Sequence, residues 1–316
     1  MNESGPEPVM LARHAMATRF EIVLHGGNPV ALRAAGEEAL DEVERLESLL
    51  SLYRTSSEIA HVNARAFHEP VRVSVPVFRL LAHACQLSEA TGGAFDITVG
   101  PLLKCWGFIG ESGRKPTDEE LAEARARVGW HHVELDAAAF TVRLARPGMI
   151  LDLGAIGKGY AIDCGSNLLR EAGVTSAILH GGTSSIYAIG CPPGADGWKI
   201  AIRQPAERIP EAENLALPTV TLRDEALSVS AVWGKSFQDE ATRFGHILDP
   251  RSGHPAGQTV LTAVALPSAT ESDALSTALL ALGPGGLAQI ARARPQARSL
   301  AVQRQTDGLS VVLSGW

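Results

Sequence analysis

The stretch that most constrains the fold is residues 149–190, MILDLGAIGKGYAIDCGSNLLREAGVTSAILHGGTSSIYAIG. Its pattern predicts a short buried strand, a glycine-rich turn carrying Lys158, an amphipathic helix, a second strand and a second glycine turn. Asp152 interrupts the apolar run MILDL, and a carboxylate removed from water must be paired, hydrogen-bonded or metal-bound. Glycines beside Lys158 let the backbone and a helix N-terminus approach an anion such as a phosphate. The stretch is therefore the first candidate for a functional site.

Composition narrows the class of protein without naming a function. The chain has 316 residues, 45% hydrophobic and 20% charged, with a formal net charge of -7. This is typical of a soluble globular protein and argues against a broad nucleic-acid surface. No apolar run is long enough for a membrane helix, no secretory signal is visible, and the four cysteines form no CxxC pair. We therefore expect a cytoplasmic protein with reduced thiols and no transmembrane segment.

The element pattern favours one α+β domain over 14–316, after a loose N-terminal lead-in at 1–13. A clean βαβ alternation is missing, so we expect mixed or antiparallel strands with helices packed around them, not a Rossmann sheet. Helices are predicted from the Asn28-Pro29 cap to Leu50, after the Ser56-Ser57 cap, over 76–90, from the Thr117 capping box to about Val128, and over 270–282. Strands are predicted at 15–25, 198–203, 220–222, 227–232 and 260–266, with a hairpin pair at 132–135 and 140–144 and a strand that runs into a tight turn over 245–253. A last helix and two strands complete the chain.

Asp273 and Thr277, in ATESDALSTALLALG, are four residues apart and share one face of the predicted helix. A carboxylate and a hydroxyl so placed offer hard oxygen ligands that suit Mg²⁺. The plainer alternative is that Asp273 only stabilises the first turn of its helix by interacting with the helix dipole. The pair alone does not decide between them.

Two other motifs each allow a structural and a functional interpretation when taken alone. GHILDPRSG places His246, Asp249 and Arg251 around a proline turn, which needs no function, although histidine often serves as a general base. GGAFD ends at Asp96, where helix termination explains the glycines and contact with a ribose or ring edge is the alternative. The phosphate-loop pattern GxxxxGK[ST] fails because Gly159 follows Lys158, and no zinc motif is present.

The order of these blocks is more specific than any one of them. MATRFEI, YRTSSEIAHVN, GGAFDITVGPL, LDLGAIGKGYAID, GG…IYAIG, HILDPRSG and DALSTALLALG follow one another from Met16 to about Gly283. Together they resemble the FAD:protein FMN transferase family, the ApbE flavin transferases.

The resemblance implies a Mg²⁺-dependent enzyme that cleaves FAD, attaches FMN through a phosphoester to a Thr or Ser hydroxyl of an acceptor flavoprotein, and releases AMP. Lys158 and His246 are the candidate catalytic residues: Lys158 would neutralise the pyrophosphate, and His246 is the best-placed general base by sequence, with Asp249 as the alternative. The resemblance implies a metal site made by the Ala155 carbonyl, Asp273 and Thr277. The cofactor-binding positions that it implies are Met16, Tyr53, Ala94, Phe95, Asp96, Asp152, Lys158 and Ile247.

The chain also departs from the family pattern at three positions. Ala17 replaces the glycine of Met-Gly-Thr, Thr183 replaces an acidic or amide residue, and Ala231 replaces a glycine. Many relatives are exported, whereas this sequence shows no signal or lipid-attachment cysteine. Two other functions remain open: a Mg²⁺-dependent FAD pyrophosphatase giving FMN and AMP, and a protein that binds or delivers FAD without chemistry.

Overall fold

The computed structural model describes residues 7–110, 113–203, 217–239, 242–306 and 308–316. The fold is α+β, as predicted, and the strand pairs β1–β2, β2–β6, β6–β7, β7–β10 and β14–β15 are antiparallel. In chain order the elements are β1 (Val9–Ala15), β2 (Thr18–Leu24), α1 (Pro29–Leu50), α2 (Glu58–Arg65), β3 (Val71–Arg72), α3 (Val75–Ala90), α4 (Gly100–Cys105), α5 (Asp118–Arg125), η1 (Trp130–His132), β4 (Val133–Asp136), β5 (Thr141–Leu144), α6 (Gly157–Glu171), β6 (Ala177–Gly181), β7 (Ser185–Ile189), β8 (Trp198–Ala201), β9 (Thr219–Leu222), β10 (Glu225–Ala231), β11 (Ser236–Asp239), β12 (Thr242–Gly245), β13 (Thr259–Leu266), α7 (Ala269–Leu282), α8 (Gly286–Ala293), β14 (Arg298–Gln305) and β15 (Gly308–Ser314).

The chain forms two compact units, each built from three segments. The first unit comprises Met1–Glu47, Ile156–Val229 and Ala263–Asp273, and the second comprises Ser48–Ala155, Ser230–Thr262 and Ala274–Trp316. The chain passes from one unit to the other five times: within α1, just before α6, and within β10, β13 and α7. The boundaries of the predicted single domain, 14–316, stay a prediction.

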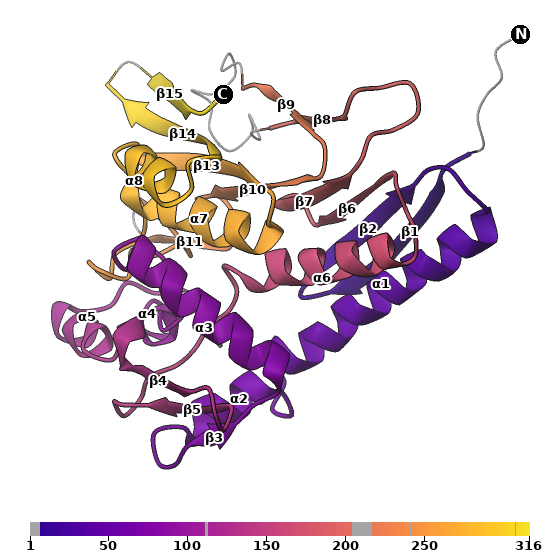
Figure 1. Cartoon of the computed structure of the whole chain (residues 1–316). Helices are drawn as coiled ribbons and strands as arrows, with labels where there is room; N and C mark the ends of the chain where they lie inside the picture. Colours follow the sequence, from indigo (N-terminus) through magenta and orange to yellow (C-terminus); the bar gives the residue numbers. More distant parts are fainter. Residues whose placement is uncertain (1–6, 111–112, 204–216, 240–241, 307) are drawn as a thin grey trace, which may run out of the picture. The chain divides into compact units, whose positions relative to one another are not determined.

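In the first unit, strands in the order β1-β2-β6-β7-β10 form a sheet, and α1 and α6 lie along one of its faces (Figure 1). Glycines permit this close packing. Gly36 of α1 lies over Leu11 and Leu24, and a side chain at Gly36 would collide with Leu11. Gly165 of α6 lies against Leu179 of β6 in the same way. Helix α6 is thereby held firmly on the strands that follow it.

In the second unit, a cluster of buried side chains surrounds Trp106. It consists of Leu102, Cys105, Trp106, Phe108, Leu121, Ala124 and Leu248. Trp106 also donates from its indole N–H to the carbonyl oxygen of Gly253 at 2.8 Å. Since Leu248 and Gly253 both belong to GHILDPRSG, this core fixes that loop through apolar packing and one buried hydrogen bond.

Most helix starts are where the capping signals placed them. The Asn28 side chain accepts from the Val30 N–H at 2.8 Å, and Ser57 accepts from the Ala60 N–H at 2.9 Å. Thr117 and Glu120 form the reciprocal capping box predicted for α5. The predicted hairpin is the β4–β5 pair, and the last helix and two strands are α8, β14 and β15.

Two predictions about local structure were wrong. Residues 149–153, predicted as a strand, form only one isolated bridge, between Ile150 and Val99, although burial alternates along them as in a strand. Strand β1 begins at Val9, inside the segment predicted as a loose lead-in, and residues 1–6 lie outside the described residues. The prediction of a strand that runs into a tight turn over 245–253 is partly confirmed: β12 ends at Gly245, and the turn follows over 246–253.

The hairpin between β1 and β2 turns through Met16 and Ala17, which have φ values of 51° and 57°. Ala15 pairs with Thr18, so the two residues form a two-residue loop with left-handed backbone at both positions. Such loops normally use Asn-Gly or another glycine pair, because a Cβ is strained at positive φ. Ala17 therefore carries strain at a position where the family pattern has glycine.

Ala17→Gly is expected to stabilise the protein by about 0.5–1 kcal/mol, because relief of the left-handed strain exceeds the added entropy of the unfolded chain. Thermal unfolding should show a midpoint about 1–2 °C higher. Ala12→Gly is the matched control, since Ala12 is exposed in the middle of β1 and should lose stability. A lower midpoint for Ala17→Gly would show that the turn is not strained.

Candidate functional site

The start of α6 meets the first turns of α7 at a buried carboxylate. The side chain of Asp273 is 5% exposed, and its Oδ2 lies 3.7 Å from Lys158 Nζ. The backbone N–H of Gly159 donates to the same oxygen at 3.0 Å. Gly159 belongs to the first turn of α6, where N–H groups have no partner within the helix. The helix N-terminus and the lysine therefore both direct positive charge to Asp273.

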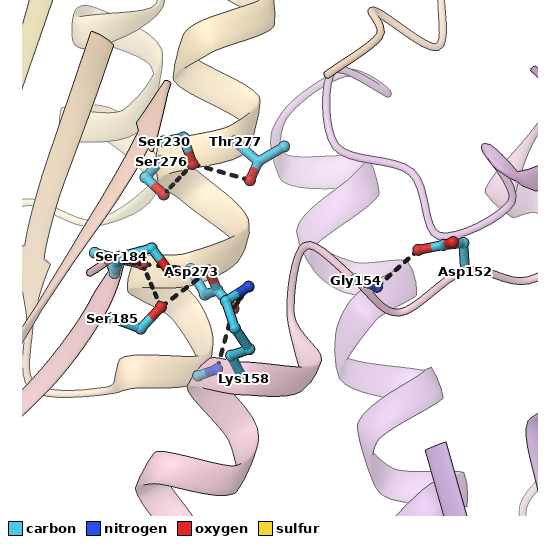
Figure 2. A network of polar contacts seen from close by, with 11 residues as sticks. Asp152, Gly154, Lys158, Ser184, Ser185, Ser230, Asp273, Ser276 and Thr277 are labelled. Atoms are coloured by element: carbon cyan, nitrogen blue, oxygen red, sulfur yellow. Dashed lines mark hydrogen bonds and ion pairs between the residues drawn. The ribbon is translucent and has the colours of Figure 1, made fainter. Parts of the chain in front are cut away.

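Two serine hydroxyls approach the other oxygen of this carboxylate (Figure 2). Ser228 of β10 donates to Asp273 Oδ1 at 3.2 Å, and Ser185 of β7 donates to it at 3.4 Å. Ser185 and Ser228 are cross-strand partners, with their hydroxyl oxygens 3.1 Å apart. A buried charge is tolerated when it is paired and hydrogen-bonded, and Asp273 meets both conditions.

Gly159 allows α6 and α7 to approach this closely. A Cβ at Gly159 would overlap the carbonyl oxygen of Ala269 and would lie 2.8 Å from Asp273 Cβ. The glycine in GKGY is thus required by backbone packing against α7. The phosphate-loop pattern would place Ser or Thr at this position, and the packing explains why neither fits.

Thr277 follows Asp273 by one turn of α7 and has its own hydroxyl partners in the second unit. Ser230 Oγ lies 3.2 Å from Thr277 Oγ1 and 2.8 Å from Ser276 Oγ. Ser228 and Ser230 alternate along β10, so one face of this strand contacts Asp273 in the first unit and Thr277 in the second. The carboxylate and hydroxyl oxygens of α7 fit the ligand preference of Mg²⁺.

Asp152 and Ala155 lie in the segment that leads into α6. Asp152 accepts from the N–H of Gly154 at 2.7 Å and donates its own N–H to the carbonyl of Ile97 at 2.7 Å. Asn63 binds the preceding residue twice, donating to Leu151 O at 2.9 Å and accepting from Leu151 N at 2.7 Å. Asn63 thus replaces the missing strand partner of MILDL. The predicted contact of Asp152 with the flavin stays a prediction.

Tyr53 is an exposed aromatic whose titration responds to Asp152. Desolvation raises the pKa of Tyr53, and the negative charge of Asp152 raises it further. The two predicted cofactor-binding residues therefore interact electrostatically within the second unit.

The GGAFD segment is buried. Ala94 and Phe95 are almost fully enclosed, and Asp96 accepts from Thr98 N, Thr98 Oγ1 and Trp130 N at 2.7–2.9 Å. Burial raises the pKa of Asp96, while these hydrogen bonds oppose the rise. Protein donors already contact this carboxylate, so its observed role is to fix the loop. Its predicted role in cofactor binding stays a prediction.

His246 begins the HILDPRSG loop, next to Ile247. Its Nδ1 lies 3.0 Å from the carbonyl oxygen of Lys235, which requires Nδ1 to be the donor. In a neutral ring with that tautomer, the basic lone pair is on Nε2. The Lys235 ammonium in turn donates to the carbonyl oxygen of Phe108, whose ring contacts His246 edge-on. The surroundings fix both the tautomer and the orientation of His246.

Asp249 is less suited to act as a base. Arg251 donates to its two carboxylate oxygens from Nε and Nη2, each at 2.8 Å, and from its backbone N–H at 2.9 Å. This bidentate pair closes the proline turn. Asp249 is therefore a structural residue of the loop.

Sequence reasoning missed the polar residues that support the site. Asn63 lies inside YRTSSEIAHVN, and Ser276 lies inside DALSTALLALG, so both were within recognised blocks. Ser185 lies inside the recognised GG…IYAIG block, whereas Ser228 and Ser230 carried no local motif, and their only signal was the alternation of serine with apolar residues in LSVSA. Their roles appear only when β7 and β10 are paired beside α7.

Comparison with known proteins decides the family. The sequence model of the ApbE family matches residues 16–301. The chain belongs to the ApbE family. It is 32% identical over 287 residues to the FAD:protein FMN transferase of Treponema pallidum, covering 86% of this chain and 78% of that protein. It is 33% identical over 268 residues to an FAD:protein FMN transferase of Klebsiella pneumoniae, covering 81% and 80%.

Solved ApbE structures have the same fold. The ApbE protein of Thermotoga maritima superimposes with a TM-score of 0.86 at 28% identity, over 98% of this chain and 97% of that chain. The flavin transferase ApbE of Vibrio cholerae gives a TM-score of 0.81 at 28% identity, over 98% and 97%. The resemblance inferred from seven sequence blocks is confirmed.

Within the described ranges, no group of three or more His, Cys, Asp and Glu side chains could hold a metal ion. Among the helices described, none is both long and apolar enough to cross a bilayer.

Gly159→Ala is expected to separate the first turns of α6 and α7, because the added methyl overlaps the backbone carbonyl of Ala269. A backbone carbonyl cannot rotate out of the way as a side chain can. We expect FAD turnover to fall by at least about tenfold, as a lost charge-orienting contact would cause. Gly257→Ala is the control, since a Cβ at Gly257 meets no atom within 4 Å. Equal activity of the two variants would contradict the packing argument.

Proposed function

We propose that the protein is an FAD:protein FMN transferase that moves FMN from FAD to a Thr or Ser hydroxyl of an acceptor flavoprotein and releases AMP. The observation that carries the proposal is the buried Asp273 carboxylate held by Lys158 and the Gly159 N–H, with Thr277 one helical turn away. Membership of the ApbE family and relatives of that name over most of the chain support it.

Mg²⁺ fits the oxygen atoms that this region offers. Asp273 and Thr277, with the Ala155 carbonyl that the family resemblance adds, are the residues that would hold it. Bound Mg²⁺ would act as a Lewis acid on the FAD pyrophosphate and offset charge on its non-bridging oxygens. A site that relies on one carboxylate and neutral oxygens also agrees with the absence of a His/Cys/Asp/Glu cluster among the described residues.

Lys158 has the role of binding and neutralising a phosphate group. Its ammonium is at the N-terminus of α6, where backbone N–H groups and the helix dipole favour anions. The same ammonium pairs with Asp273. Phosphoryl transfer depends mainly on positioning and on neutralising the charge of phosphate oxygens, which is what Lys158 supplies.

His246 is the proposed general base. The attacking hydroxyl of the acceptor must lose a proton, and Nε2 of the neutral ring is the basic atom when Nδ1 donates to Lys235 O. The carbonyl of Lys235 also stabilises the imidazolium that forms. FMN binding is assigned to Met16, Tyr53, Ala94, Phe95, Asp96, Asp152 and Ile247 by the family resemblance.

Asp273→Asn should reduce Mg²⁺-dependent FMN transfer by at least about 10²-fold, because it removes the only carboxylate proposed for the metal. The assay is in-gel flavin fluorescence of candidate acceptor proteins incubated with FAD and Mg²⁺. Asp196→Asn is the control, because Asp196 is an exposed acid in the first unit. Full transfer by wild type in excess chelator would refute the metal mechanism.

His246→Ala should slow single-turnover FMN transfer by about 10²–10⁴-fold while leaving FAD affinity within a few-fold of wild type. Rapid quenching with separation of AMP and flavin products gives the rate. Unchanged single-turnover transfer would require another base. AMP and FMN formed without protein-bound flavin, even with acceptor present, would instead identify a pyrophosphatase.

A further inference from the structure

The N-terminus of α7 is held by a side chain from another helix. Asp163 of α6 accepts from the N–H groups of Ala269 at 2.8 Å and Thr270 at 2.9 Å. It also accepts from the hydroxyls of Thr270 at 2.6 Å and Ser268 at 2.8 Å. All four contacts lie within the first unit.

These bonds complete the cap of α7. The first N–H groups of a helix have no partners inside it, and the usual N-cap side chain satisfies one of them. Ser268 accepts from the N–H of Glu271 at 3.2 Å, and the N–H groups of Ala269 and Thr270 are satisfied by Asp163 instead. The negative charge of Asp163 also lies at the positive end of the α7 dipole. The register of α7 against α6 thus depends on Asp163.

Asp163 and Gly159 are four residues apart, on the same face of α6. Gly159 contacts the carbonyl of Ala269 and donates to Asp273, while Asp163 binds the residues immediately before and after Ala269 as well as Ala269 itself. One face of α6 therefore fixes the first turn of α7 at two points. Asp273 is four residues beyond Ala269, so its position follows from this attachment.

We propose that Asp163 is the positioning residue that holds Asp273 against Lys158 and the Gly159 N–H, and so sets the affinity of the site for Mg²⁺. This inference rests on the proposed function for its metal, but the attachment of α7 can be tested without metal. Partners that orient a metal ligand typically change metal affinity by 10–100-fold when they are removed.

The test compares Asp163→Asn with wild type by two measurements. Hydrogen exchange of the Gly159 amide, followed by NMR in the metal-free protein, reports whether Asp273 still accepts from it. Calorimetric titration with Mg²⁺ alone gives the dissociation constant. The Asn side chain places an N–H₂ group where the carboxylate of Asp163 accepts hydrogen bonds, so two donors face each other. We therefore expect the Gly159 amide to exchange at least tenfold faster and the Mg²⁺ dissociation constant to be at least tenfold higher than in wild type.

Asp224→Asn is the matched control. Asp224 is an acid of the same unit that accepts from the Gly190 N–H at 3.1 Å and from Arg170 Nη2 at 3.2 Å. The variant makes the same change of charge and removes a comparable set of contacts away from α7. Both measurements should stay within twofold of wild type.

If Asp163 only stabilises the fold, Asp163→Asn will lower the unfolding midpoint and leave the Mg²⁺ dissociation constant within twofold of wild type. That result would overturn the proposal.

If Asp163→Asn does not fold, Thr270→Val is the second variant, because it removes one hydroxyl donor to Asp163. It should raise the Mg²⁺ dissociation constant by about threefold, and an unchanged constant would also overturn the proposal. If wild type binds no Mg²⁺, the metal part of the proposed function fails, and Gly159 exchange alone then decides whether Asp163 positions Asp273.

Discussion

A buried carboxylate needs several donors, and much of the first unit is arranged to supply them to Asp273. A helix N-terminus and a lysine approach one oxygen, and a pair of cross-strand serines approaches the other. Two donors come from the start of α6 and one each from β7 and β10, so all three elements have to be held in place. The glycine in the first turn of α6 and the cross-strand register of β7 with β10 both serve this one carboxylate.

The donors also show how the carboxylate proposed to bind the metal is stabilised by the protein itself. The lysine balances the carboxylate, so its charge is compensated by groups of the fold. In the proposed function a phosphate would compete for the same ammonium, and a cation would compete for the same carboxylate. Binding would then exchange one set of ionic partners for another, which would limit the desolvation that each charge must undergo.

Local signals in the sequence were enough for the parts of the fold that depend on neighbours along the chain. The Asn28, Ser57 and Thr117 caps and the spacing of apolar residues placed helices correctly, because these interactions span only a few residues. The strand assigned to MILDL was wrong because its partners, Asn63 and Ile97, are distant in sequence. The order of the sequence blocks predicted the family and singled out Lys158 and Asp273 separately, but it predicted neither their ion pair nor the serines that contact Asp273.

The two hydrogen bonds between the Asn63 side chain and the Leu151 backbone affect how the protein folds. The two residues are separated by 88 positions, so their hydrogen bonds form only after a long segment of the chain has become compact. Closing such a loop costs conformational entropy before any contact repays it, and contacts of this kind slow folding. We therefore expect the turn that leads into α6 to become ordered after the local helices have formed.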